Sequence, residues 1–218
     1  LSPFLGTSHF VWTAQIAVTL VALSVGYYVG GWLVDKSPKL NHLYYAILAA
    51  AVYLAATVPM VKPICLKLIE LPLAGATLLA SVFLFLVPLA LLAMTGPFLI
   101  RLLTKSVKSV GSNVGRLSAI STLGSVAGTM LIGYVLIPHL PNSVTMLITA
   151  GILIILSVIY FIGWGKGKGV NAIFLALGLS IIMGYSGTRS YFGNTMNYGG
   201  FKWDVLYRAN SNYGELLV

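Results

Sequence analysis

Long runs of apolar residues, each long enough to cross a lipid bilayer, constrain this chain more than any other feature of its sequence. A bilayer core about 30 Å thick needs roughly 20 consecutive apolar residues in a helix. Runs of about this length lie at residues 10–34, 43–61, 73–94, 117–137, 143–162 and 170–185. They are continuously apolar rather than alternating, which favours helices over barrel strands. The sequence therefore predicts an all-α fold, a polytopic transmembrane helical bundle of about six spans.

The composition supports this prediction and excludes most classes of soluble protein. Hydrophobic residues make up 58% of the 218 residues, and charged residues make up only 8%, far from the averages of soluble domains. The formal net charge is +9, but the bases lie between the apolar runs rather than in a basic stripe with interleaved aromatics. That distribution favours anionic lipid headgroups over nucleic acid. We therefore expect the lipid bilayer as a partner, and no nucleic acid.

The chain divides into two parts, a transmembrane helical domain over residues 1–185 and a short polar tail over residues 186–218. We expect the tail to be mostly irregular. Within the first part, Lys62-Pro63 is expected to end the second span, because proline cannot continue a helix comfortably. The sequence Thr95-Gly96-Pro97 is expected to break the third span in the same way.

A basic segment at residues 98–110 separates the third and fourth spans. Arg101, Lys105 and Lys108 recur there at spacings of four and three among apolar residues. This pattern predicts an amphipathic helix that lies along the membrane surface.

Loop charges give the bundle a direction, because Lys and Arg are retained on the cytoplasmic side of a membrane. With six spans, most of the bases fall on one side: Lys36, Lys39, Arg101, Lys105, Lys108, Arg116, Lys166 and Lys168. Only Lys62 and Lys67 lie in loops on the other side. We therefore expect a multi-pass protein of the plasma (bacterial inner) membrane, with its tail on the extracytoplasmic side.

Small residues at helical spacing indicate where helices approach one another, because lipid tails are as apolar as leucine and association depends on close packing. The fourth span carries a small-residue ridge of Ser118, Ser121, Gly124, Ser125 and Gly128. Gly26 and Gly30 form a similar notch in the first span. Both features predict helix packing inside the bundle. A sliding or rocking surface in a transporter is the functional alternative.

No set of residues in the chain has the spacing of a catalytic or cofactor site. There is no zinc-type cysteine pair, nucleophile elbow or phosphate loop. His9 and His139 fall near the same predicted face, which would allow a shared metal or haem, but ordinary interfacial histidines explain them as well. We expect no catalytic residues, no metal and no cofactor in this chain.

Three stretches, taken together and in this order, resemble the membrane-embedded spermidine synthase-like proteins, in which a transmembrane region precedes an aminopropyltransferase domain. The first comprises residues 3–8 (PFLGTS), 11–13 (VWT) and 26–31 (GYYVGG) with Asp35, and the second is residues 115–129 (GRLSAISTLGSVAGT). The third comprises Tyr207 and residues 211–218 (SNYGELLV), and it is similar to the segment that opens the synthase domain. Within it, Ser211 and Tyr213 are a candidate substrate-side motif.

The resemblance implies a family activity, which is aminopropyl transfer from decarboxylated S-adenosylmethionine to putrescine. The family's glycine loop, ribose-binding acid and catalytic aspartate have no counterpart within these residues. The leading hypothesis is therefore a membrane-anchoring or assembly region, whose partners would be a downstream synthase-like domain or other membrane subunits. Two alternatives stay open: a non-catalytic subunit of a larger membrane complex, and a small-molecule carrier, for instance for polyamines.

Overall fold

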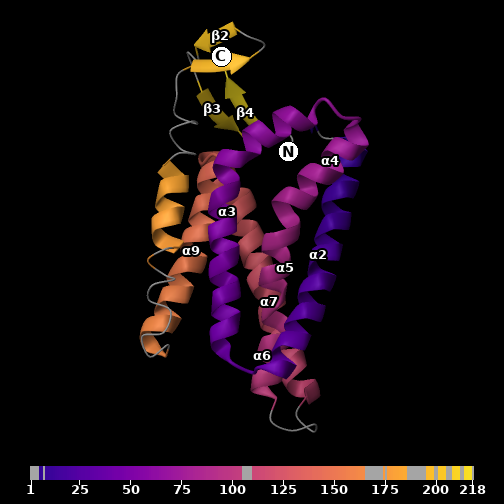
Figure 1. Cartoon of the computed structure of the whole chain (residues 1–218), viewed down its shortest axis with the longest axis vertical. Coiled ribbons are helices and arrows are strands. Elements are labelled where there is room, and N and C mark those ends of the chain that lie inside the picture. Colours follow the sequence, from indigo (N-terminus) through magenta and orange to yellow (C-terminus); the bar gives the residue numbers. More distant parts are fainter. Residues whose placement is uncertain are drawn as a thin grey trace.

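The computed structural model of the chain is a bundle of long helices with a small β region at one end (Figure 1). It describes residues 5–6, 8–104, 110–164, 174, 176–185, 195–198, 201–204, 208–211 and 214–217. Within these residues, five helices are long and apolar enough to cross a membrane. The chain is therefore a multi-pass membrane protein, and the predicted all-α helical bundle is confirmed.

The first two spans are single long helices, α2 (His9–Lys36) and α3 (Leu40–Leu68). Helix α3 continues through Pro59 and Pro63, so the prediction that Lys62-Pro63 ends it is wrong. A proline inside a helix removes one backbone hydrogen bond, and the remaining bonds of α3 carry the helix past Pro59 within the span and past Pro63 near its end.

The third span is assembled from shorter pieces that follow one another from Leu73 to Leu103. They are α4 (Leu73–Ser81), the π-helical turn η1 (Val82–Leu86), α5 (Val87–Ala93) and α6 (Thr95–Leu103). Only Met94 separates α5 from α6, so the predicted break at residues 95–97 is wrong. Pro97 is the third residue of α6, where a backbone N–H would have no partner within the helix in any case.

The predicted surface helix over residues 98–110 is also corrected by the structure. Residues 98–103 belong to α6, whose Phe98 is fully buried in the bundle. Residues 105–109 lie outside the described residues, and Val110 already begins the next helix. The described first half of this segment therefore continues the third span, and within it Phe98 packs on protein.

The fourth and fifth spans are the last two of the long helices in chain order. The fourth comprises α7 (Val110–Met130), the π-helical turn η3 (Leu131–Leu136) and the short α8 (Ile137–His139). The fifth is α9 (Asn142–Gly163), within one residue of its prediction at both ends. The described part of the sixth predicted run is a shorter apolar helix, Ala176–Tyr185; residues 170–173 and 175 lie outside the described residues.

Both π-helical turns end just before a proline. Pro88 follows η1 by two residues and Pro138 follows η3 by two residues. A π turn pairs each carbonyl with the N–H five residues later, and for Phe83 that residue is Pro88, which has no N–H. The Tyr53 hydroxyl of α3 donates a hydrogen bond of 2.6 Å to the Phe83 carbonyl. A side chain from a neighbouring helix thus satisfies a carbonyl that the proline leaves without a π-type partner.

The helices pack in pairs rather than around one thick core. Helix α2 contacts α4, α5 and α6, and α3 contacts α9 and α5, as the arrangement in Figure 1 shows. One buried cluster joins Val34, Leu43, Ile47 and Phe98, and another joins Leu48, Ala51, Ile154 and Ala176. Pairwise packing of this kind is expected in lipid, where no hydrophobic drive pulls the helices into a common core.

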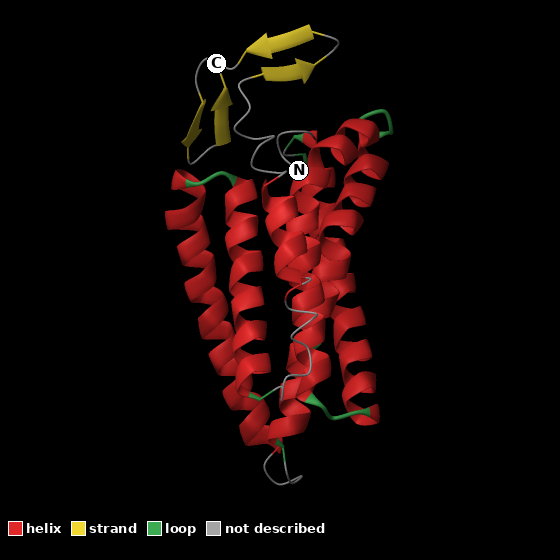
Figure 2. Ribbon diagram, turned by 60° about the vertical axis from the view of Figure 1, so that its left-hand side comes forward, coloured by secondary structure: helices red, strands yellow, loops and turns green. Residues whose placement is uncertain are grey.

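The tail is a point of difference from the sequence prediction. Its described residues form two antiparallel hairpins rather than irregular chain. Strand β1 (Thr195–Tyr198) pairs with β2 (Phe201–Asp204), and β3 (Arg208–Ser211) pairs with β4 (Gly214–Leu217). The dipeptide Gly199-Gly200 between β1 and β2 is a hairpin signal that outweighed the polar composition. The hairpins lie beyond the helices, at the end of the bundle where the N-terminus lies (Figure 2).

Candidate functional site

The notch in the first span faces the third span at very short range. A Cβ atom added to Gly26 would come within 2.3 Å of the Ala90 carbonyl oxygen, and one added to Gly30 within 2.8 Å of the Met94 Cα. Only glycine allows α2 to approach the backbone of the third span so closely. Gly26 and Gly30 therefore act as packing positions between the first and third spans.

The small-residue ridge of the fourth span, Ser118, Ser121, Gly124, Ser125 and Gly128, has a different environment. No residue of α7 or η3 is buried, and nothing described lies within 4 Å of a Cβ placed on Gly124 or Gly128. Helix α7 is fixed near its start, where it contacts α6 and the Asn113 side chain donates a hydrogen bond to the Leu103 carbonyl. The ridge was predicted to pack inside the bundle. In the described part of the chain it faces outward.

The other candidate residues from the sequence are not brought together in the part of the chain that the structure describes. Ser211 ends β3 and pairs with Gly214 across the hairpin, and Tyr213 lies outside the described residues. The His139 ring contacts the Val135 carbonyl through Nδ1 at 2.8 Å. Among the described residues, no group of three or more His, Cys, Asp or Glu side chains is arranged to hold a metal ion.

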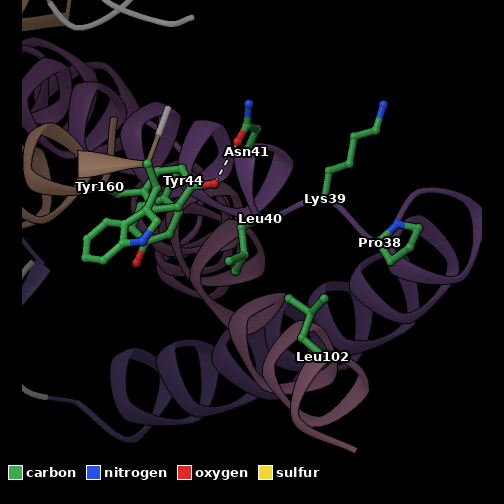
Figure 3. Close-up of a pocket in the computed structure, with 8 residues that line it drawn as sticks. Pro38, Lys39, Leu40, Asn41, Tyr44, Leu102 and Tyr160 are labelled. Atoms are coloured by element: carbon green, nitrogen blue, oxygen red, sulfur yellow. Dashed lines mark hydrogen bonds between the residues drawn. The ribbon is translucent and has the colours of Figure 1, made fainter. Parts of the chain in front are cut away.

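An open hollow lies at the end of the bundle where α3 begins and α9 ends, and Figure 3 shows the side chains that line it. Its volume is about 580 Å³. Four segments meet there: the loop after α2, the first turn of α3, the end of α6 and the end of α9. The residues that line it are Pro38, Lys39, Leu40, Asn41, Tyr44, Leu102, Tyr160 and Trp164.

A tyrosine pair gives the hollow a rigid wall. The rings of Tyr44 and Tyr160 stack with their centroids 3.8 Å apart and their planes 2° from parallel. The Tyr160 hydroxyl donates a hydrogen bond of 2.7 Å to Asn41 Oδ1. Because the amide oxygen of Asn41 is engaged in this way, its nitrogen keeps both donor hydrogens for another acceptor. The wall therefore holds a hydrogen-bond donor in a fixed orientation.

The charge on the hollow is positive. Lys39 is one of its lining residues, and Figure 3 shows its ammonium group and the Asn41 amide nitrogen extending in the same direction, on the side away from the Leu40 and Leu102 side chains. Asp35, a nearby acid, is paired with Arg101 at 3.5 Å. The first turn of α3 adds partial positive charge, because the N–H groups of Leu40 and Asn41 cannot be paired within the helix.

These residues form a surface that suits ligand binding. Among the described residues that line it there is no carboxylate, histidine, cysteine or serine, and these side chains often act as catalytic groups. One lysine, one amide and an apolar wall instead form a binding surface that favours an anion attached to an apolar group.

Sequence reasoning missed this hollow entirely. Asn41 and Tyr160 are 119 residues apart, and neither belongs to a recognisable motif. The available signal was indirect: tyrosine and tryptophan at the ends of two spans, on the side with the most bases, are typical of the headgroup region. The aromatic residues at the span ends do not predict that the second span contacts the fifth.

The chain was also compared with known proteins. It matches no known protein family, no curated protein and no solved structure.

Proposed function

We propose that this chain is the membrane-anchoring and assembly region of a spermidine synthase-like protein. The family activity would be aminopropyl transfer from decarboxylated S-adenosylmethionine to putrescine, carried out by a domain that the tail begins. In this proposal the chain itself contributes anchoring and helix contacts rather than catalysis.

The observation that carries the proposal is the β structure of the tail. Residues 211–218 resemble the opening of the synthase domain, and β4 (Gly214–Leu217) falls within them as half of a hairpin beside a helical membrane bundle. A two-stranded hairpin is marginally stable in water, and its open edges can accept further strands. The tail thus has the form expected of a segment that a larger sheet would extend.

The orientation of the anchor follows from the loop charges. Lys36, Lys39, Arg101 and Arg116 lie at the helix ends opposite the hairpins, whereas Lys62 lies toward the hairpin end of α3. The positive-inside rule then puts the basic end in the cytoplasm. In the proposal the membrane is the plasma (bacterial inner) membrane, and the hairpins are extracytoplasmic.

The outward ridge of α7 supports the assembly part of the proposal. Gly124 and Gly128 are smooth positions that let another membrane helix approach closely, and no described residue occupies them. A helix of a membrane subunit that packs there would attach the module to a larger assembly.

A polyamine carrier is less consistent with these observations. A path for a polycation needs carboxylates that face a cavity, but the described residues that line the hollow include Lys39 and no acid. Asp35, the acid nearest to it among the lining segments, is exposed and paired with Arg101.

A fusion experiment tests whether the tail is the opening of a synthase domain. A soluble spermidine synthase from which the corresponding opening segment has been deleted would be joined after Val218. Solubilised membranes would then be assayed with decarboxylated S-adenosylmethionine and putrescine. We expect aminopropyl transfer, because the tail would supply the missing strands to the sheet.

Two matched controls make the result decisive. The truncated enzyme without the fusion should be inactive, and a fusion that keeps the enzyme's own opening segment should be active. If the second control is active while the fusion through the native tail is not, the tail does not act as a synthase opening, and the proposed function is wrong.

A further inference from the structure

We propose that the hollow lined by Lys39, Asn41, Tyr160 and Trp164 binds a phosphate group carried on an apolar molecule, such as the headgroup of an anionic lipid. This inference concerns the end of the bundle opposite the tail, and it does not depend on the proposed function.

The polar side of the hollow suits an anion with several oxygen atoms. Lys39 provides a full positive charge without an ion-pair partner in the described part of the chain, and a lysine binds phosphate as a point charge. The Asn41 amide nitrogen adds two donors, because the Tyr160 hydroxyl already engages the amide oxygen. A carboxylate could also pair with the Lys39 ammonium group. A phosphate group has more oxygen atoms, however, and can accept hydrogen bonds from Lys39 and Asn41 at the same time.

The remaining wall suits an apolar group rather than a free ion. Leu40, Leu102 and the stacked rings of Tyr44 and Tyr160 line the hollow together with Trp164. A volume of about 580 Å³ is far larger than one phosphate needs and lies in the range of small-molecule sites. The glycerol and the first carbons of an acyl chain would cover these apolar side chains.

The position of the hollow matches the depth of lipid headgroups. It is formed where α2, α6 and α9 end and where α3 begins. Helix α9 ends at Gly163, and α3 begins at Leu40. Helix ends with tyrosine and tryptophan lie at headgroup level in membrane proteins. Basic pockets between transmembrane helices on the cytoplasmic side are a known way of holding phosphate headgroups.

A lipid titration monitored by native mass spectrometry tests the proposal. The whole chain in detergent would be titrated with phosphatidylglycerol or with phosphatidylcholine, and the dissociation constant of the first retained lipid would be measured. We expect tighter retention of phosphatidylglycerol. The substitution Lys39→Gln should weaken that retention about tenfold, since it removes a charge-assisted contact.

Lys62→Gln is the matched control, because Lys62 is also an exposed lysine but lies toward the far end of α3, whereas Lys39 directly precedes the first residue of that helix. It should change the dissociation constant by less than about twofold, the effect of a surface charge distant from the site. A second variant, Trp164→Leu, keeps every charge and should weaken binding about threefold through the apolar wall. Circular dichroism would check that each variant keeps its helix content.

Two results would overturn the proposal. Equal losses for Lys39→Gln and Lys62→Gln would mean that lipid responds only to overall charge. Equal retention of the two lipids by the unchanged chain would mean that no anion site exists.

Competition with glycerol 3-phosphate identifies the source of the phosphate. If millimolar glycerol 3-phosphate leaves the bound phosphatidylglycerol in place, the site is a lipid site. If it displaces the lipid from the unchanged chain but binds the Lys39→Gln variant about tenfold more weakly, the same site takes a soluble phosphate ester.

Discussion

Two helices of this bundle carry the same kind of small-residue pattern and use it differently. On α2, Gly26 and Gly30 lie against the backbone of the third span at Ala90 and Met94, whereas on α7 no described atom lies within 4 Å of a Cβ placed on Gly124 or Gly128. The same residue type thus marks an occupied contact in one region and an unoccupied surface in the other. A glycine pattern predicts that a backbone can approach, but it does not say whether the partner belongs to the same chain.

The largest expected difference in stability between the packed third span and α7 should appear when a large side chain is removed from each. Phe98→Ala should lower the free energy of unfolding by about 3 kcal/mol, because Phe98 is fully buried and its loss leaves a cavity. Leu123→Ala on α7 should change it by less than about 0.5 kcal/mol, because Leu123 is 70% exposed. Unfolding by SDS in mixed micelles, followed by circular dichroism, measures both.

Similar losses for the two variants would contradict the division into a packed region and an outward-facing helix. A loss for Leu123→Ala that appears only at high protein concentration would instead point to an assembly contact on α7.

The spans could be predicted from sequence because their signal is local. Helix α9 was predicted within one residue, since an apolar run between Pro141 and Gly163 is bounded on both sides by residues that interrupt helices. Proline misled elsewhere: Pro63 lies inside α3, and Pro97 lies in the first turn of α6. In hydrocarbon, an interrupted helix costs more than a missing hydrogen bond, so rules derived from soluble proteins end helices too early.

The candidate sites were harder to predict because they depend on contacts distant in sequence. Nothing in the order of residues pairs Asn41 with Tyr160. Nor does it show that α5 lies against Gly26 while no described residue lies against Gly124. The hairpins were missed for a different reason. A polar, glycine-containing tail has weak local preferences, and strand pairing depends on partners that composition does not reveal.

A smaller change in the free energy of unfolding should follow when one glycine of each helix is replaced by alanine. Gly26→Ala would place a Cβ within 2.3 Å of the Ala90 carbonyl oxygen, so α2 and α5 must separate, and overpacking of this kind costs about 2 kcal/mol. Gly124→Ala meets nothing described within 4 Å and should stabilise its helix by about 0.5 kcal/mol, because alanine is the better helix former. Thermal unfolding in detergent would follow both variants.

A loss of stability for Gly26→Ala together with a gain for Gly124→Ala would support the comparison. Destabilisation by Gly124→Ala equal to that by Gly26→Ala would show that α7 also packs tightly, and the account of its outward ridge would then be wrong.

The smallest expected change in the free energy of unfolding concerns the two π-helical turns, η1 and η3. Tyr53→Phe removes the hydrogen bond to the Phe83 carbonyl in η1 and should cost about 1 kcal/mol, the usual net value of one such bond in a membrane bundle. Tyr134 lies in η3 and is 81% exposed, so Tyr134→Phe should have almost no effect. The same SDS titration compares them, and equal losses would mean that the Tyr53 hydroxyl does not support the turn.

The central claim is that these helices cross a membrane, with the N-terminus and the hairpins at one end and Lys39 at the other. Cysteine labelling in sealed vesicles tests it most directly, with the buried Cys65 replaced by alanine and single cysteines placed at Lys39, Lys62 or Thr195. A membrane-impermeant maleimide should label Lys39→Cys from the cytoplasmic side only, and Lys62→Cys and Thr195→Cys from the opposite side only. Labelling of Lys39→Cys and Thr195→Cys from the same side would contradict the account.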